Sequence, residues 1–334
     1  MDSNTKQQLP YTEGSNPLSK LLDGSLNADQ FLLTLRACDG QVFSGFNHEV
    51  GLMDTECIHH IEVAAKSCAK LLQSHHPAKV VMTGCGTSGR VSFLTARRYN
   101  NMLNGFGKLQ NRFGYTCAGG DSAILLSDEM PEDDPVTGVA DLQEAAGGNK
   151  ECVLIGVTCG VSAPYVAGQV AHLLTSKQTF EPHAAHSGIC LVGFNPVNMA
   201  RDSAFSGLPS GWKSCRDVAV GLDRHIKEVN RSDPSFDKNH GCSIVNPVVG
   251  PEPVSGSSRM KGGTATLVIL DVICLHALGL AGAFPEGHSM HRLSHCSVLE
   301  LLCKYQTVHS LTYSMAQHHL PRVMDAAASA LRGG

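Results

Sequence analysis

The stretch VVMTGCGTSGRVSFL, residues 80–94, constrains the fold more than any other part of the sequence. An apolar run, Val80–Met82, breaks into the glycine-rich segment Gly84–Gly89, and apolar residues then resume. This order predicts a strand, a tight loop and the start of a helix. Glycines permit positive φ angles and close backbone approach, and Thr87 and Ser88 add hydroxyl donors. The loop therefore suits an anion at the positive end of a helix dipole, although a turn without a ligand remains an alternative for this motif alone.

Length and charge exclude several classes of protein. A chain of 334 residues can form one large domain or two smaller ones, and its formal net charge of −4 gives no sign of a nucleic-acid or anionic-membrane partner. The longest apolar run, residues 265–280, is interrupted by Asp271 and His276 and falls short of a membrane span. The first residues lack the basic start and apolar stretch of a secretory signal. We therefore expect a soluble intracellular protein, cytoplasmic or nuclear or both, with no membrane partner.

The cysteines and histidines do not form a metal-binding pattern. Thirteen cysteines are scattered along the chain, and no two of them are spaced as C-x-x-C. In an intracellular chain, isolated cysteines favour small buried side chains over a disulfide framework or a zinc site. Histidine doublets such as His59–His60 point to different faces of a helix, so they make poor ligand pairs. We expect no metal and no cofactor.

Strands and helices alternate along the chain. Short apolar runs predict strands at residues 79–83, from 113, at 151–157, at 189–194 and at 242–245, and helical spacing predicts helices at 50–73, 90–103, 136–146, 165–174 and 264–280. This alternation is typical of an α/β fold with a doubly wound parallel sheet. We expect a loosely ordered arm with a helical turn or two at 1–40 and the sheet domain at 41–290. The segment 291–334 should be helical, with two helices that meet near 317–321.

Three further loops carry polar side chains. One follows the strand at 151–157, another precedes the helix at 264–280 beside Arg259 and Lys261, and an acidic loop spans 127–135. Hydroxyls at the ends of parallel strands, together with a few carboxylates, suit a phosphorylated sugar or polyol. The spacing Gly84-x-Gly86-x-x-Gly89 also fits a dinucleotide-binding loop. Such a site needs an acidic residue for the ribose about twenty positions on, but residues 108–112 offer basic side chains instead. A dinucleotide ligand is therefore disfavoured. No serine-hydrolase elbow, H-E-x-x-H or Walker lysine motif is present.

Several of these motifs occur in the order found in one known family. They are Gly84–Arg90, Ala118–Gly120, Gly193–Pro196, Asn246–Glu252 and Ser255–Gly263. Together they resemble the sugar isomerase (SIS) fold, in the branch that contains the glucokinase regulatory protein and the bacterial N-acetylmuramic acid 6-phosphate etherases. The resemblance extends from about residue 43 to the end. Tyr115, Leu191–Val197, Met199–Arg201 and Thr312–Ser314 are more similar to the regulatory protein than to the etherases.

The resemblance implies a ligand and a set of residues that bind it. The ligand would be fructose 6-phosphate or fructose 1-phosphate, and glucokinase would be the partner that the protein inhibits. Thr158 stands where the regulatory protein has a serine, and the hydroxyl is kept. The implied ligand-binding residues, from the four loops, are Gly86, Thr87, Ser88, Glu129, Glu132, Thr158, Gly160, Ser162, Ser257 and Ser258.

The same resemblance offers an enzyme as an alternative. The etherases use two glutamates, which correspond here to Glu132 and to Arg98. Arginine cannot exchange a proton at neutral pH, and loss of one member of an acid–base pair should slow the reaction by about 10²–10⁴. We therefore expect binding without catalysis, with Glu132 as the catalytic residue if the chain is an etherase. A non-catalytic SIS dimerisation module is the third hypothesis.

Vertebrate regulatory proteins have two SIS domains and a helical lid that contributes basic residues to the phosphate. This chain ends about where the second domain would begin, so we expect a fragment, a splice form or a one-domain homologue. In the last case a homodimer could complete the site.

Overall fold

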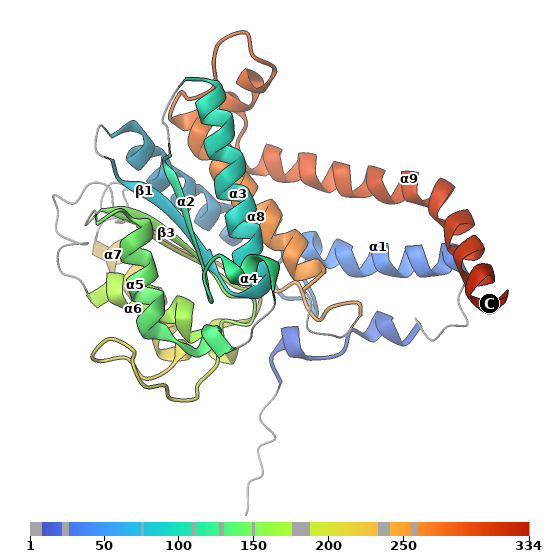
Figure 1. Cartoon of the computed structure of the whole chain (residues 1–334), viewed down its shortest axis with the longest axis horizontal. Coiled ribbons are helices and arrows are strands. Elements are labelled where there is room, and N and C mark those ends of the chain that lie inside the picture. Colours follow the sequence, from blue (N-terminus) through green and yellow to red (C-terminus); the bar gives the residue numbers. More distant parts are fainter. Residues whose placement is uncertain are drawn as a thin grey trace, which may run out of the picture.

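We describe the fold from a computed structural model of the chain (Figure 1). The structure describes residues 9–21, 27–74, 77–107, 111–126, 130–148, 151–175, 188–232, 241–254 and 259–333. A central sheet has helices on both of its faces, and two long helices project from one side of it.

The sheet confirms the predicted doubly wound α/β fold of SIS type. It consists of five parallel strands in the order β2-β1-β3-β4-β5. In register, Val80 lies opposite Phe113 on one side and opposite Val153 on the other. The strands are β1 (Lys79–Gly84), β2 (Phe113–Cys117), β3 (Cys152–Val157), β4 (Gly188–Val192) and β5 (Cys242–Val245).

The five helices predicted in the sheet region are present in the same order, several begin at other residues, and the structure adds α4 and α7. Helix α2 begins at residue 55 rather than 50, after Asp54 has closed a turn by accepting the Gly51 N–H at 2.5 Å. The α-helices are α1 (Ala28–Ser44), α2 (Thr55–Gln73), α3 (Gly86–Gly105), α4 (Ser122–Leu125), α5 (Pro135–Ala145), α6 (Pro164–Thr175), α7 (Cys215–Ser232), α8 (Lys261–Leu280) and α9 (Val298–Gly333). Single 3-10 turns are η1 (Tyr11–Glu13), η2 (Pro17–Leu21), η3 (Met130–Asp133), η4 (Val197–Met199) and η6 (Ser289–His295).

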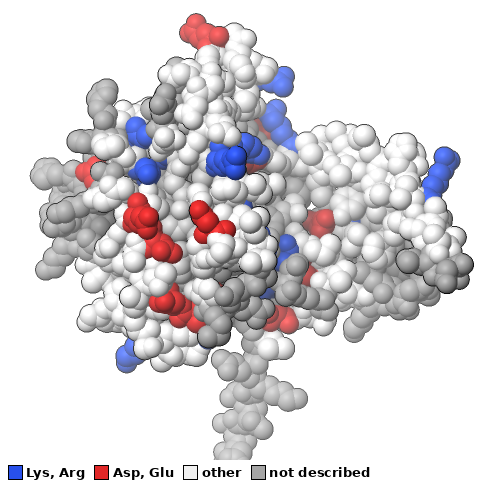
Figure 2. Space-filling view, viewed as in Figure 1, with Lys and Arg blue, Asp and Glu red and all other residues white. Residues whose placement is uncertain are grey.

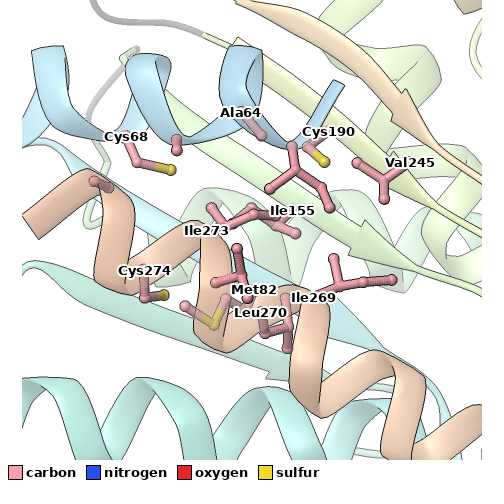
Figure 3. Close-up of a cluster of buried hydrophobic side chains, with 14 of the residues drawn as sticks. Ala64, Cys68, Met82, Ile155, Cys190, Val245, Ile269, Leu270, Ile273 and Cys274 are labelled. Carbon is pink, nitrogen blue, oxygen red and sulfur yellow. The ribbon is translucent and has the colours of Figure 1, made fainter. Parts of the chain in front are cut away.

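Each face of the sheet has its own apolar core, because side chains alternate along a strand. Val80 and Met82 face a core formed with α1, α2, α3, α8 and α9, whereas Val81 faces a core formed with α5, α6 and α7. Figure 3 shows the first core, where side chains of α2, of α8 and of the strands lie together; Ala64, Cys68, Met82, Ile155, Cys190, Val245, Ile269, Leu270, Ile273 and Cys274 are labelled. Ten of the thirteen cysteines are buried, as expected for small apolar side chains.

Helix α8 is the central helix of that first core. By length and composition it is, within the described ranges, the one helix that could cross a membrane, but 67% of its most apolar 18-residue window is buried inside the protein. It carries a buried carboxylate, Asp271, which accepts hydrogen bonds from Arg98, from the Tyr99 hydroxyl at 3.3 Å and from the Tyr305 hydroxyl at 2.5 Å. Asp271 thereby ties α3, α8 and α9 together.

The N-terminal region contains more helix than predicted. Helix α1 has 17 residues, where the sequence suggested one or two turns. Its start is fixed by a reciprocal capping box, in which the Asn27 side chain accepts the Gln30 N–H at 2.9 Å and Gln30 accepts the Asn27 N–H at 3.1 Å. Helix α1 packs against α9, which the sequence alone does not reveal (Figure 1).

The C-terminal prediction of two helices is wrong. Helix α9 is one helix of 36 residues with Pro321 inside it. A proline removes one backbone hydrogen bond and bends a helix without having to end it, and Figure 1 shows α9 changing direction in its last part. On its outer side Val308, Leu311 and Met315 are 57%, 58% and 67% exposed.

Strand β2 forms one edge of the sheet. The Asn100 side chain from α3 pairs with this edge: its carbonyl accepts the Phe113 N–H at 3.0 Å, and its amide donates to the Phe113 carbonyl at 2.7 Å. Both backbone groups of Phe113 are therefore satisfied by a side chain.

Candidate functional site

The strand order places a topological switch point at the carboxyl ends of β1 and β3. Because β2 lies on one side of β1 and β3 on the other, the chain reverses its winding direction there, and ligands of open α/β sheets bind at this switch point. The loops that follow these two strands are residues 85–88 and 158–163. They contain the glycine and hydroxyl residues predicted from the sequence.

The first loop is the N-terminus of α3. Helix α3 begins at Gly86, four residues earlier than predicted, because the glycine-rich residues form its first turn. The N–H groups of Ser88 and Gly89 bond to the Cys85 carbonyl at 3.1 and 3.4 Å, and the side chain of Cys85, the N-cap residue, forms no capping hydrogen bond. The N–H groups of Gly86 and Thr87 precede these and have no acceptor within the helix. This end of α3 can therefore accept an anion.

Glycines in this loop meet different requirements. Gly86 has a φ of +51°, a conformation that side chains rarely adopt. A Cβ on Gly89 would lie 2.4 Å from the Cys117 sulfur, and one on Gly84 would lie 2.7 Å from the Ser88 Cβ. The helix can start this close to the sheet only because these positions lack side chains.

The second loop is organised by Thr158. Its hydroxyl oxygen accepts the N–H groups of Ser162 at 3.0 Å and Ala163 at 3.3 Å. The O–H of Thr158 is still able to donate to a ligand. Gly160 is buried in this loop, and its carbonyl accepts a hydrogen bond from the Asn195 side chain at 3.3 Å.

The two loops meet each other and the start of α8. The Ser88 hydroxyl lies 3.5 Å from the Cys159 sulfur. A Cβ placed on Gly263 would lie 3.2 Å from the Thr87 methyl group, so the N-termini of α3 and α8 are adjacent. The Glu252 carboxylate caps α8 by accepting the N–H groups of Lys261 at 2.7 Å and Gly262 at 3.0 Å. Helix α8 thus already has an anionic cap, whereas the N-cap residue of α3 is Cys85, whose side chain forms no capping hydrogen bond.

The cationic side chains of Lys261 and Arg259 lie beside this junction. Lys261 is fully buried, its ammonium donates to the Gln41 side chain at 2.8 Å, and burial lowers its pKa to about 8. Arg259 is partly exposed and forms an ion pair with Glu13 at 2.8 Å. On the face shown in Figure 2, Lys and Arg side chains lie over α3 and Asp and Glu side chains over α5, without a continuous basic surface.

The acidic loop reaches the same region from the other side. Burial, and secondarily the Glu132 carboxylate, raise the pKa of the Cys85 thiol, so the negative charge of Glu132 acts on the residue before α3. Asp133 forms an ion pair with Arg201 at 2.7 Å, and Arg201 also donates to the Ser162 carbonyl at 3.4 Å. The predicted residues Glu129, Ser257 and Ser258 lie outside the described residues. Among the described residues, no group of three His, Cys, Asp or Glu side chains is placed to hold a metal ion.

Arg98 does not belong to this junction within one chain. It follows Gly86 by twelve residues of α3, which corresponds to about 18 Å along the helix axis. Its guanidinium binds Asp271 and lies over the Tyr99 ring, 5.0 Å from its centre. In this structure Arg98 serves helix packing.

Several residues at the junction were not predicted as site residues. Cys159 was expected only to be a buried side chain, although it touches Ser88. Glu252 follows a Gly-Pro pair ahead of a helix, which could have indicated a capping carboxylate. Thr12 and Asn195 are 183 residues apart in sequence and hydrogen-bond to each other, which nothing in their local sequence reveals.

Comparison with known proteins identifies the family. Residues 62–174 match the model of the glucokinase regulatory protein N-terminal SIS domain. The chain is 33% identical to the glucokinase regulatory protein of Xenopus laevis over 333 residues, which cover 98% of this chain and 49% of that protein. It is also 33% identical to the glucokinase regulatory protein of Mus musculus, over 92% of this chain and 45% of that protein. It is 27% identical to the N-acetylmuramic acid 6-phosphate etherase of Klebsiella aerogenes over 78% of this chain and 70% of the etherase. The chain spans about half the length of the curated regulatory proteins that it matches. It therefore carries the N-terminal SIS domain of the glucokinase regulatory protein family.

Proposed function

We propose that this protein is a sugar-phosphate-binding regulator of the glucokinase regulatory protein type, with fructose 6-phosphate or fructose 1-phosphate as its ligand. The observation that carries the proposal is the N-terminus of α3, which its N-cap residue Cys85 leaves without a side-chain cap, at the switch point of the sheet and next to the hydroxyls of the second loop. A phosphate there would complete the first turn of α3, as Glu252 completes that of α8.

Each predicted residue then has a defined task. The N–H groups of Gly86 and Thr87 and the hydroxyls of Thr87 and Ser88 would hold the phosphate. The sugar hydroxyls would donate to acidic side chains. The remaining predicted contacts, by loop, are Glu129 and Glu132 from the acidic loop, Thr158, Gly160 and Ser162 from the second loop, and Ser257 and Ser258 from the third.

The partner follows from the relatives' names, and both the partner and the location are proposals for this chain. Glucokinase is the proposed partner, inhibited by the protein in a way that responds to the bound fructose phosphate, in the cytoplasm, the nucleus or both. We also propose residues 41–290 as the SIS domain, of which the family model matches 62–174. Residues 1–40 and 291–334 would be its N- and C-terminal extensions.

Ligand-dependent thermal unfolding tests the binding proposal. Ligand at 100 times its dissociation constant should stabilise the protein by about 2.7 kcal/mol. Thr87→Ala or Ser88→Ala should each weaken binding by about 10- to 100-fold, since each removes a hydrogen bond to a charged group. Ser44→Ala, on the exposed part of α1, is the matched control. No shift with either fructose phosphate at millimolar concentration would contradict the proposal.

An etherase-like lyase is the second candidate, favoured by the similarity to etherases and by the proximity of the Glu132 charge to Cys85. Release of lactate from N-acetylmuramic acid 6-phosphate, abolished by Glu132→Gln, would establish it. We expect no release, because Arg98 occupies the position of the second glutamate.

A dimerisation module without ligand is the third candidate. It predicts a dimer on a sizing column whose unfolding temperature is the same with and without every sugar phosphate tested.

A further inference from the structure

The 3-10 turn η1 lies against the second loop of the candidate site. The Thr12 N–H donates to the Asn195 side-chain oxygen at 3.1 Å, and the Asn195 amide donates to the Thr12 hydroxyl at 2.8 Å. The same amide contacts the Gly160 carbonyl. A segment close to the N-terminus is thus hydrogen-bonded to the end of β4 and, through it, to the loop after β3.

The same turn holds Arg259 of the third loop. One guanidinium nitrogen lies 2.8 Å from a Glu13 carboxylate oxygen, and the other terminal nitrogen donates to the Thr12 carbonyl at 3.1 Å. The Arg259 and Glu13 side chains are 28% and 48% exposed. The ion pair is therefore accessible to solvent, and to an ion that competes for the guanidinium.

Arg259 lies close to the residues that define the site. A Cβ placed on Gly262 would lie 3.7 Å from the Arg259 Cβ and 3.6 Å from the Cys159 sulfur. The Cys159 sulfur itself lies 3.5 Å from the Ser88 hydroxyl. Burial raises the pKa of the Cys159 thiol, and the Ser88 hydroxyl and the Arg259 charge act in the opposite direction. The positive charge of Arg259 therefore acts on the junction of the first two loops.

The chemistry of the two nearby cations favours Arg259 as a ligand for phosphate. A guanidinium binds phosphate through two parallel hydrogen bonds. The Lys261 ammonium is buried, donates to Gln41 and has a pKa lowered to about 8. Arg259 keeps its full charge at neutral pH.

We infer that Arg259 is the phosphate-binding cation of the sugar-phosphate site and that Glu13 occupies it when the ligand is absent. This inference rests on the proposed function. The ligand phosphate and the Glu13 carboxylate then compete for one guanidinium, and binding of the ligand releases the carboxylate of the turn Tyr11–Glu13. Any surface that includes this turn changes with ligand occupancy.

Calorimetric titration of the full chain tests the competition, with fructose 6-phosphate, inorganic phosphate and fructose as probes. Glu13→Gln should bind fructose 6-phosphate and phosphate about two- to fivefold more tightly, which is the effect of removing one partly exposed ion pair. Arg259→Gln should bind them about 10- to 100-fold more weakly. In the double variant the gain from Glu13→Gln should disappear. Binding of fructose should not respond to Glu13→Gln.

The matched control is Glu49→Gln. The Glu49 carboxylate also anchors the turn, by accepting the Tyr11 hydroxyl at 3.2 Å, but it forms no ion pair with Arg259 in the described structure. Glu49→Gln should leave the affinity unchanged. An equal gain in Glu49→Gln would show that loosening of the turn, and not competition, is the cause, and would overturn the inference.

Two further outcomes separate the inference from the function on which it rests. If the unaltered chain binds fructose 6-phosphate in a Ser88-dependent way but Glu13→Gln gains nothing, the inference fails and the proposed function stands. If neither the unaltered chain nor Glu13→Gln binds either phosphate at millimolar concentration, both fail. Circular dichroism and thermal unfolding establish that each variant is folded, and Arg259→Lys, which keeps the charge, should lose less affinity than Arg259→Gln.

Discussion

The buried carboxylate of Asp271 offers the sharpest test of how the helices are held together. It accepts hydrogen bonds from residues of α3 and α9 while it is itself on α8. Asp271→Asn keeps the size and one acceptor but removes the charge. Because Asp271 and Tyr99 are both buried, the Tyr99 hydroxyl cannot exchange the carboxylate for water without opening the core.

The expected loss of stability follows from the contacts. A hydrogen bond to a charged group contributes about 1.5–3 kcal/mol and a neutral one about 0.5–1.5 kcal/mol, so each charge-assisted bond should lose about 1 kcal/mol in Asp271→Asn. The Arg98 side chain is 53% exposed and regains water, which reduces its share. We expect a loss of about 2 kcal/mol for Asp271→Asn. Asp271→Ala should lose about 4 kcal/mol, because the Tyr305 hydroxyl is then left without its acceptor in the core.

Urea unfolding followed by circular dichroism measures both losses. A double-mutant cycle with Tyr305→Phe should give a coupling energy of about 1 kcal/mol. The control is Asp223→Asn, which breaks the exposed pair of Asp223 with Lys227 on α7 and should change stability by less than about 0.5 kcal/mol. If Asp271→Asn is as stable as that control and the coupling is absent, the network does not stabilise the protein.

Three other predictions concern the site and the N-terminal helix. Gly89→Ala should abolish fructose-phosphate binding and destabilise the protein by about 2–4 kcal/mol in urea, because its Cβ would lie 2.4 Å from the Cys117 sulfur. Lys261 has a pKa of about 8 in the folded state and about 10.4 when unfolded. Between these two pKa values the unfolded chain binds more protons than the folded chain. The free energy of unfolding, relative to that of Lys261→Met, should therefore rise with pH between about 8 and 10.4, by up to about 1.4 kcal/mol per pH unit. A difference in free energy that is constant with pH would contradict this. Asn27→Ala should cost about 1 kcal/mol in the same urea assay, through loss of the cap of α1.

The sheet and the first loop were predictable because their signals are local. An apolar run that ends in glycines marks β1 and its loop, and each later strand carries the same kind of signal. The start of α3 was placed four residues too late, since three glycines within six residues argue against a helix by propensity. Only the close approach of α3 to the sheet, which Gly84 of β1 and Gly89 of α3 permit, explains why the helix begins at Gly86.

The remaining errors involve contacts between distant segments. Helix α1 is stabilised by packing on α9, and Pro321 is accommodated within a helix, so neither can be read from a window of a few residues. Arg98, which corresponds by resemblance to an etherase glutamate, contacts Asp271 within one chain, and its local sequence does not reveal that contact. The link between the turn Tyr11–Glu13 and Arg259 joins residues that are 246 positions apart in the sequence.

The pairing of Asn100 with Phe113 has a consequence for assembly. An edge strand with free backbone groups is a template on which another chain can add a strand. Here the carboxamide acts as a single-residue substitute for a neighbouring strand, and an incoming strand would have to displace it at the first residue of β2. Extension of the sheet across this edge by a second copy would therefore cost these two hydrogen bonds, which lowers the tendency of β2 to pair with another chain.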